Sequence, residues 1–217
     1  MLRGSIFKPR TNPGDFQGLG EKGIGYLREA KEKTNLPVVT EVMGSDEIEL
    51  IAEVADVLQI GSRNMQNYDL LKKIGQKAPN VPVLLKRGMA STKEEVVGAI
   101  EYLRKYGHDE QIIICERGIR TSVSGEYDRN TLDIDFVADL KSENFPYPVI
   151  VDPSHSGGRK ELVAKLCFAG IGAGADGFLI EVKEKGSKAL CDDKQAVIPE
   201  ELAEIINKTN KIYELLN

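Results

Sequence analysis

Short apolar runs alternate along this chain with segments of helical periodicity, and this order restricts the possible folds more than any other feature. The runs are four to seven residues long, rich in Val, Ile and Leu, and nearly continuous. Strands with this pattern are typical of parallel sheets that are covered on both faces. The predicted strands are residues 5–8, 37–42, 56–60, 82–86, 111–115, 147–151 and 176–182.

Each predicted strand is followed by a segment whose apolar spacing indicates a helix. Two of these helices have recognisable starts, because the residues from Thr92 to Glu95 fit a capping box and Pro199 suits a first helical turn. The predicted helices are residues 23–33, 46–55, 68–77, 93–105, 134–141, 160–173 and 199–216. Such alternation predicts a parallel sheet with outer helices, either doubly wound or closed into a barrel.

Two features distinguish these architectures and favour the barrel. A dinucleotide-binding sheet needs a glycine fingerprint after its first strand, and GxGxxG is absent there. Charged residues instead follow all seven predicted strands, as they do at the mouth of a (β/α)₈ barrel. We therefore predict an α/β fold, a TIM (β/α)₈-type barrel, as a single domain over residues 1–217. Seven of the eight strand–helix units are expected, with the N-terminal unit and its first strand missing.

Composition restricts the partners and the compartment. The net charge of −5 argues against general affinity for nucleic acid or an anionic membrane. No stretch approaches the roughly 20 apolar residues of a membrane-spanning helix, and no secretory signal is apparent. The three cysteines show no metal-type CxxC spacing, which favours reduced thiols. We expect a cytoplasmic homo-oligomer that acts on small molecules and has no nucleic-acid or membrane partner.

Basic side chains at the ends of the predicted strands indicate an anionic ligand. Cations that converge in an acidic protein repel one another unless an anion lies among them, and arginine binds phosphate or carboxylate in a bidentate manner. We therefore predict a substrate with more than one anionic group. The alternative is that these residues are rim charges paired with nearby Asp and Glu. The residues are Lys8, Arg10, Arg63, Lys86 and Arg117.

A second group of polar residues indicates a metal site. His155 follows the strand at 147–151, Glu181 ends the next predicted strand, and Asp192 lies in the loop beyond. An imidazole with two carboxylates suits a divalent Mn, Fe, Co or Zn ion, which could polarise a substrate carbonyl. The alternative for His155 is a hydrogen-bonded loop residue. The other histidine, His108, lies in a polar run at a helix end and is expected to be exposed.

Seven motifs along the chain resemble, in order, the signatures of the DAHP synthase family. The likeness is to its type I β branch, near KDO-phosphate synthase, and extends from about residue 3 to residue 205. It implies a metal-dependent transferase of the shikimate pathway and aromatic amino acid biosynthesis, which condenses phosphoenolpyruvate with erythrose 4-phosphate. The products would be 3-deoxy-D-arabino-heptulosonate 7-phosphate and phosphate. The motifs are FKPRTNPGDFQGLG, LQIGSRNMQN, LLKRGM, IICERGIRT, VIVDPSHSGGRK, GFLIEV and CDDKQ.

The resemblance also implies roles for individual residues. His155, Glu181 and Asp192 match three of the family's four metal ligands. Lys8 would be the catalytic proton donor, and Glu41 is a further acid–base candidate. Phosphoenolpyruvate would be bound by Arg3, Lys8, Arg63, Lys86 and Arg117, and erythrose 4-phosphate by Arg10 and Thr11.

Two departures from the family pattern leave alternatives open. The fourth metal ligand, a cysteine on the family's first strand, has no counterpart here. Lys183 replaces a frequent histidine and is expected to alter the contacts behind the ligands, while Asp193 replaces a glycine and is expected to add negative charge near the ion. One alternative is KDO-phosphate synthase acting on arabinose 5-phosphate, although KPRT rather than a KANRS-like segment favours the four-carbon aldose. The other is a truncated, non-catalytic barrel that binds phosphorylated ligands.

Overall fold

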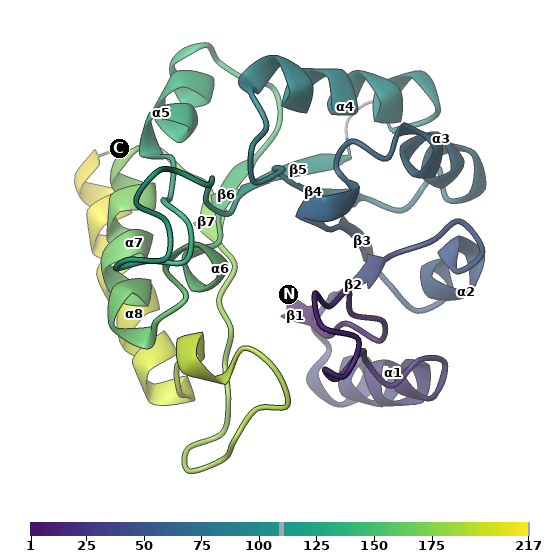
Figure 1. Cartoon of the computed structure of the whole chain (residues 1–217), viewed down its shortest axis with the longest axis horizontal. Coiled ribbons are helices and arrows are strands. Elements are labelled where there is room, and N and C mark those ends of the chain that lie inside the picture. Colours follow the sequence, from purple (N-terminus) through teal and green to yellow (C-terminus); the bar gives the residue numbers. More distant parts are fainter. Residues whose placement is uncertain (109–110, 217) are drawn as a thin grey trace. The chain divides into compact units, whose positions relative to one another are not determined.

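The computed structural model describes residues 1–108 and 111–216, which form two compact units. The first unit contains Met1–Gly88 and Thr92–Ile113, and the second contains Met89–Ser91 and Ile114–Asn217. Strands alternate with helices in both units, as predicted (Figure 1). The strand pairings within each unit are parallel.

The first unit is a parallel sheet whose strands lie in chain order, with helices along one side (Figure 1). Every residue of its second, third and fourth strands is buried, which explains their nearly continuous apolar sequence. Its strands are β1 (Leu2–Arg3), β2 (Val38–Val42), β3 (Val57–Ile60) and β4 (Val83–Lys86). Its helices are α1 (Lys22–Thr34), α2 (Ile48–Ala52), the 3₁₀ turn η1 (Ser62–Asn64), α3 (Tyr68–Lys77) and α4 (Lys93–Lys105).

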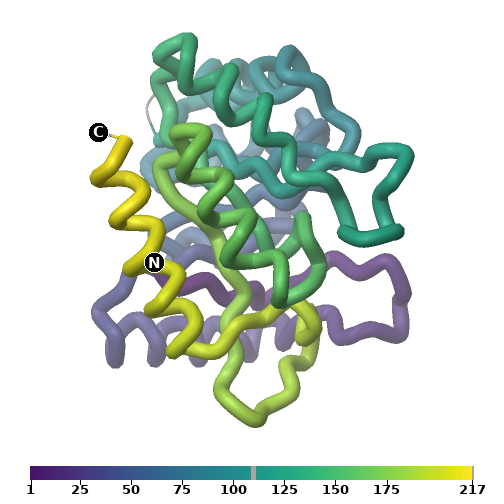
Figure 2. Tube along the Cα trace, turned by 90° about the vertical axis from the view of Figure 1, so that its left-hand side faces the viewer, coloured from purple at the N-terminus to yellow at the C-terminus, as the bar shows by residue number. Residues whose placement is uncertain are grey.

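The second unit continues the same alternation. Strand β5 (Ile112–Glu116), whose last three residues belong to this unit, pairs with β6 (Val149–Val151), and β6 pairs with β7 (Gly177–Phe178). Helices α7 and α8 lie side by side over a buried cluster that includes Val163, Cys167 and Ile205 (Figure 2). The helical elements are α5 (Ile134–Ser142), α6 (Pro153–Gly157), α7 (Lys160–Gly172), η2 (Asp193–Gln195) and α8 (Pro199–Leu216).

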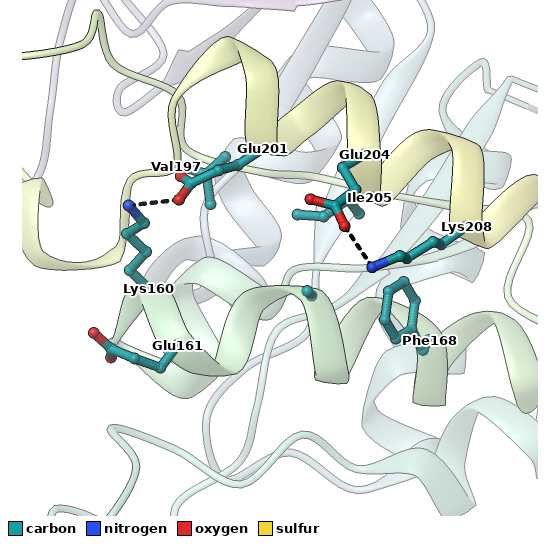
Figure 3. Close-up of a pocket in the computed structure, with 9 residues that line it drawn as sticks. Lys160, Glu161, Phe168, Val197, Glu201, Glu204, Ile205 and Lys208 are labelled. Carbon is teal, nitrogen blue, oxygen red and sulfur yellow. Dashed lines mark hydrogen bonds and ion pairs between the residues drawn. The ribbon is translucent and has the colours of Figure 1, made fainter.

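A groove of about 360 Å³ separates parts of α7 and α8 (Figure 3). Two ion pairs line it, with 2.7 Å between Lys160 Nζ and Glu201 Oε1 and 2.5 Å between Lys208 Nζ and Glu204 Oε1. The groove is lined by none of the catalytic, substrate-binding or metal-binding residues predicted from the sequence. It is therefore separate from the candidate site.

The predictions for the first and last strands were partly wrong. The first paired strand is Leu2–Arg3 rather than residues 5–8, and Phe7 instead forms an antiparallel bridge with Gly18. The last strand is only Gly177–Phe178, within the predicted 176–182. Among the described residues these two strands each pair on one side only, so their ladders end early although their sequences are strand-like.

The prediction that His108 is exposed was wrong. Its side chain is fully buried, because Gly107 takes a φ of 131° and turns the chain after α4 back against the end of α3. A Cβ at position 107 would lie 3.0 Å from the carbonyl oxygen of Gly75. A polar run at a helix end does not show such a turn.

Both predicted helix starts were confirmed. Thr92 forms a complete capping box with Glu95, and Pro199 is the first residue of α8. Cys115 and Cys167 are buried core residues. None of the helices in the described residues is both long enough and apolar enough to cross a membrane.

Candidate active site and metal centre

The register of the first sheet places several predicted site residues on one face. Glu41 of β2 lies opposite Gln59 of β3, and Arg3 pairs with the residue two positions before Glu41. Lys86 lies two positions beyond the β4 partner of Gln59. Because side chains alternate between the faces of a strand, Arg3, Glu41, Gln59 and Lys86 point to the same side.

Glu41 is the buried centre of this group. It is 7% exposed, and Gln59 Nε2 donates a hydrogen bond to its Oε2 at 2.9 Å. Burial raises the pKa of Glu41, although the positive charges of Lys86, Arg3 and Lys8 and the hydrogen bond from Gln59 oppose that shift. A carboxyl group with a raised pKa can exchange protons nearer neutral pH than an exposed glutamate can.

Gly61 makes room for this carboxylate. A Cβ at position 61 would lie 2.1 Å from Glu41 Oε1 and 3.0 Å from its Cδ, well inside van der Waals contact. The glycine of the motif LQIGSRN is therefore required by a side chain on the neighbouring strand and not by its own backbone, whose φ is −66°.

The remaining predicted residues of the first unit lie in and around the loop after β1. Arg63 donates from Nη2 to Thr11 Oγ1 at 3.2 Å and from Nη1 to the carbonyl of Pro9 at 3.4 Å. Arg10 forms an ion pair with Asp15, at 3.1 Å between Nη2 and Oδ2. The structure therefore brings Arg63 and Thr11 together. Arg10 instead fits the alternative interpretation, in which the basic residues are rim charges paired with nearby Asp and Glu.

The three predicted metal ligands meet in the second unit. One ligand atom from each of His155, Glu181 and Asp192 lies within 4.8 Å of the other two. His155 is in α6, Glu181 follows β7, and Asp192 precedes η2. His155 Nε2 and Glu181 Oε1 are 3.5 Å apart. These residues come from three separate segments, so local sequence alone does not bring them together.

Asp152 orients the imidazole. It caps α6 by accepting a hydrogen bond from His155 N at 2.9 Å, and its Oδ2 lies 2.7 Å from His155 Nδ1. Asp152 is fully buried. A carboxylate at Nδ1 makes that nitrogen the donor, which leaves the lone pair on Nε2 directed toward Glu181. The sequence DPSH suits this turn, because aspartate is a favoured N-cap and proline a favoured first residue.

Neighbouring groups hold the other two ligands. The backbone N–H of Glu181 donates to Ser154 Oγ at 3.0 Å. Asp192 has a φ of 56°, and its Oδ1 lies 3.6 Å from Arg129 Nη1. The first contact holds the backbone of Glu181, and the second lies at the carboxylate of Asp192.

Arg117 lies in the second unit, behind His155. Its Nη2 donates to the backbone carbonyl of His155 at 3.3 Å. Burial lowers the pKa of Arg117, and the negative charge of Asp152 works in the opposite direction. An arginine guanidinium keeps its positive charge in proteins, so Arg117 remains suited to binding an anion.

The expected extra negative charge of Asp193 is paired. Its Oδ1 lies 2.7 Å from Lys183 Nζ, and the hydrogen bond from Lys183 lowers the pKa of Asp193. Both residues were recognised as departures from the family pattern, but their mutual contact was not predicted.

Three contacting residues were missed in the sequence. Gln59 could have been found, because it is a polar residue inside an otherwise apolar strand. Ser154 lies between Asp152 and His155, yet a serine there is also common in turns. Arg129 lies in a polar loop and carries no local signal.

The donor set fits a divalent transition-metal ion. One imidazole with two carboxylates suits Mn, Fe, Co or Zn, and the buried Asp152 presents the imidazole in the required tautomer. Among the described residues no cysteine belongs to this set, although Cys191 adjoins Asp192 in sequence.

The fold and these residues define an α/β protein of the barrel class, with a candidate metal centre where its strands end. The chain belongs to the DAHP synthetase I family, which matches residues 1–216. This membership confirms the resemblance seen in the motifs.

Relatives and solved structures agree with this membership. The chain is 48% identical over 216 residues to the phospho-2-dehydro-3-deoxyheptonate aldolase of Thermotoga maritima, covering 100% of this chain and 62% of that protein. The 2-dehydro-3-deoxyphosphooctonate aldolase of Geobacter metallireducens is more distant, at 31% identity over 220 residues, 94% of this chain and 76% of that protein.

The crystal structure of the Thermotoga maritima DAHP synthase matches with a TM-score of 0.89 and 47% identity, over 99% of this chain and 60% of that chain. A truncated form of the enzyme gives a TM-score of 0.87 and 46% identity, over 99% of this chain and 76% of that chain. These likenesses confirm the predicted fold class. The chain spans 62% of the length of its Thermotoga maritima relative.

Proposed function

We propose that this chain condenses phosphoenolpyruvate with erythrose 4-phosphate to give 3-deoxy-D-arabino-heptulosonate 7-phosphate and phosphate, the first step of the shikimate pathway. The observation that carries the proposal is the meeting of His155, Glu181 and Asp192, with His155 oriented by the buried Asp152. The 48% identity to a phospho-2-dehydro-3-deoxyheptonate aldolase supports the choice of reaction.

The cations of the first unit suit phosphoenolpyruvate, which carries a phosphate and a carboxylate. Lys86, Arg3 and Lys8 are close enough to Glu41 for their charges to lower its pKa, so all three cations lie near this carboxyl group. We assign these three residues and Arg63 to binding this substrate, because fixed cations stabilise the negative charge that develops during reaction. Arg117, in the second unit, is a further residue that we propose to bind phosphoenolpyruvate.

The proposed reaction forms one carbon–carbon bond and, from water, one carbon–oxygen bond at C2, and it breaks the carbon–oxygen bond between C2 and phosphate. C3 of phosphoenolpyruvate attacks the aldehyde carbon, and Lys8 donates a proton to the resulting alkoxide. Water adds at C2, Glu41 accepts its proton, and the bond between C2 and the phosphate oxygen breaks. A divalent Mn, Fe, Co or Zn ion, held by His155, Glu181 and Asp192, would act as a Lewis acid toward the aldehyde oxygen.

Arg10 and Thr11 are the proposed ligands of the aldose phosphate. Arg10 is paired with Asp15, a partly exposed ion pair near the surface, where such pairs contribute little to stability, so a phosphate can displace the carboxylate. The motif KPRT and the lower identity to the 2-dehydro-3-deoxyphosphooctonate aldolase both favour erythrose 4-phosphate over arabinose 5-phosphate.

A phosphate-release assay tests the proposed function. The purified chain is incubated with phosphoenolpyruvate, Mn²⁺ and either erythrose 4-phosphate or arabinose 5-phosphate. We expect turnover with the four-carbon aldose and little with the five-carbon aldose. The reverse preference would assign the chain to the KDO-phosphate branch.

A second candidate is a barrel that binds phosphorylated ligands without turnover. It is favoured by the donor set, in which the described residues supply three ligands and no cysteine. Binding of Mn²⁺ and phosphoenolpyruvate without phosphate release would support it. In either case we propose that the chain forms a homo-oligomer and is cytoplasmic. The free cysteines are in keeping with a reducing compartment.

A further inference from the structure

We propose that Lys183 and Asp193 form a clamp that positions the carboxylates of Glu181 and Asp192 for metal binding. The inference rests on the proposed metal site and adds two positioning residues to it. Lys183 lies two residues after Glu181, and Asp193 directly follows Asp192. A contact between Lys183 and Asp193 therefore joins the two segments that carry the carboxylate ligands.

The contact is a double one. Lys183 Nζ lies 2.7 Å from Asp193 Oδ1 and 3.3 Å from the backbone carbonyl oxygen of Asp193. The side chains are 21% and 34% exposed, so the pair is partly shielded from water. Asp193 Oδ1 also accepts a hydrogen bond from Ala189 N at 2.8 Å. One carboxylate thus holds the lysine and the returning end of the loop together.

Backbone hydrogen bonds continue this connection on the strand side. Val197 N donates to the carbonyl of Glu181 at 3.0 Å, and Lys183 N donates to the carbonyl of Val197 at 2.9 Å. Residues 184–188 between the clamped ends are exposed and form a projecting loop (Figure 2). The Lys183–Asp193 pair therefore closes the base of a loop that has few other constraints.

Asp192 needs such support because its backbone is in the left-handed region. Its φ of 56° is uncommon for a residue other than glycine and persists where surrounding contacts fix it. Gln195 N donates to the carbonyl of Asp192 at 3.2 Å, and the clamp fixes the next residue. Without the clamp, we expect Asp192 to sample conformations that direct its carboxylate away from His155.

Charge and positioning predict opposite results for a Lys183→Met variant. Removing a positive charge near a cation site raises the affinity for Mn²⁺ if charge is the only effect. Loss of positioning lowers it, and loss of groups that orient metal ligands costs about tenfold or more. Whether the affinity for Mn²⁺ rises or falls in Lys183→Met therefore shows whether Lys183 acts through its charge or by positioning the ligands.

Calorimetric titration of the metal-free protein with Mn²⁺ tests this sign. We expect Lys183→Met to bind about tenfold more weakly than the wild type, and Lys183→Arg to recover most of the loss. Lys185→Met is the matched control, because it removes the same charge from an exposed position in the same loop and should bind no more weakly than wild type. Equal or tighter binding by Lys183→Met would overturn the proposal.

Limited proteolysis separates failure of the clamp from failure of the proposed function. Trypsin can cut after the exposed Lys185 and Lys188, and we expect faster cutting in Lys183→Met than in wild type without any metal. If wild type does not bind Mn²⁺, the proposed metal site fails while the proteolysis still tests the clamp. Unchanged cutting in Lys183→Met would overturn the clamp even if wild type binds Mn²⁺ and turns over.

Discussion

Replacing Asp152 by asparagine tests the orientation of the proposed metal ligand. The carboxylate accepts hydrogen bonds from both His155 N and His155 Nδ1, at 2.9 and 2.7 Å. An asparagine amide has one oxygen, which we expect to keep the bond to His155 N because asparagine is as good an N-cap as aspartate. The NH₂ group then faces Nδ1, and the imidazole proton moves to Nε2, the nitrogen proposed to bind the ion.

The expected decrease in metal affinity follows from the loss of the hydrogen bond between residue 152 and His155 Nδ1. A hydrogen bond to a charged group contributes about 1.5–3 kcal/mol, and loss of the partner of a metal-bound histidine costs roughly 10–100-fold in affinity. We therefore expect Asp152→Asn to weaken Zn²⁺ or Mn²⁺ binding by about that factor. Calorimetry measures the affinity, and ¹⁵N NMR of the imidazole identifies the tautomer.

Asp133→Asn is the matched control for this variant. Asp133 caps α5 by accepting a hydrogen bond from Phe136 N at 3.1 Å, so the substitution makes the same chemical change at another helix N-terminus. We expect it to leave metal affinity unchanged. Wild-type affinity in Asp152→Asn, with Nε2 still unprotonated, would refute the argument.

Three further predictions concern the first unit. Gly61→Ala places a Cβ 2.1 Å from Glu41 Oε1 and should cost about 1–3 kcal/mol, seen as a Tm lower by several degrees; an unchanged Tm would contradict the close approach. Burial lowers the pKa of His108, so its contribution to stability is present above about pH 6.5 and is lost as the pH falls through the lowered folded-state pKa. Urea unfolding between pH 7.5 and 5 should show a smaller loss of stability in His108→Met than in wild type, and equal pH dependence would exclude His108 as a contributor. Lys8→Ala should abolish turnover and leave Tm within a degree or two of wild type, whereas near-normal turnover would remove Lys8 from the mechanism.

The sequence was informative about the fold wherever burial was uniform. The strands at 38–42, 57–60 and 83–86 are buried at every residue, so their continuous apolar runs indicated both their type and their position. The first and last strands were misplaced or too long, because an apolar run shows that a segment can pair and not that a neighbour is present on each side. The turn at Gly107 that buries His108 depends on packing against α3, to which a polar run gives no clue.

For the candidate site, too, the sequence indicated individual residues but not all of their contacts. His155 was predicted as a metal ligand because Glu181 ends the next predicted strand and Asp192 lies in the loop beyond it. Its partner Asp152 lies three residues earlier and was visible as a charge at the strand end. The link between Lys183 and Asp193 spans an exposed loop, so its ends could be identified from the sequence but not their contact.

The close approach of Glu41 and Gly61 has a consequence for how this protein can vary. The carboxylate occupies the volume where a side chain on the next strand would begin, so the two positions share one space. A larger residue at 61 requires either a shorter residue at 41 or a displaced Glu41 carboxylate, and either change disturbs the hydrogen bond from Gln59. We therefore expect substitutions at 41, 59 and 61 to be inherited together.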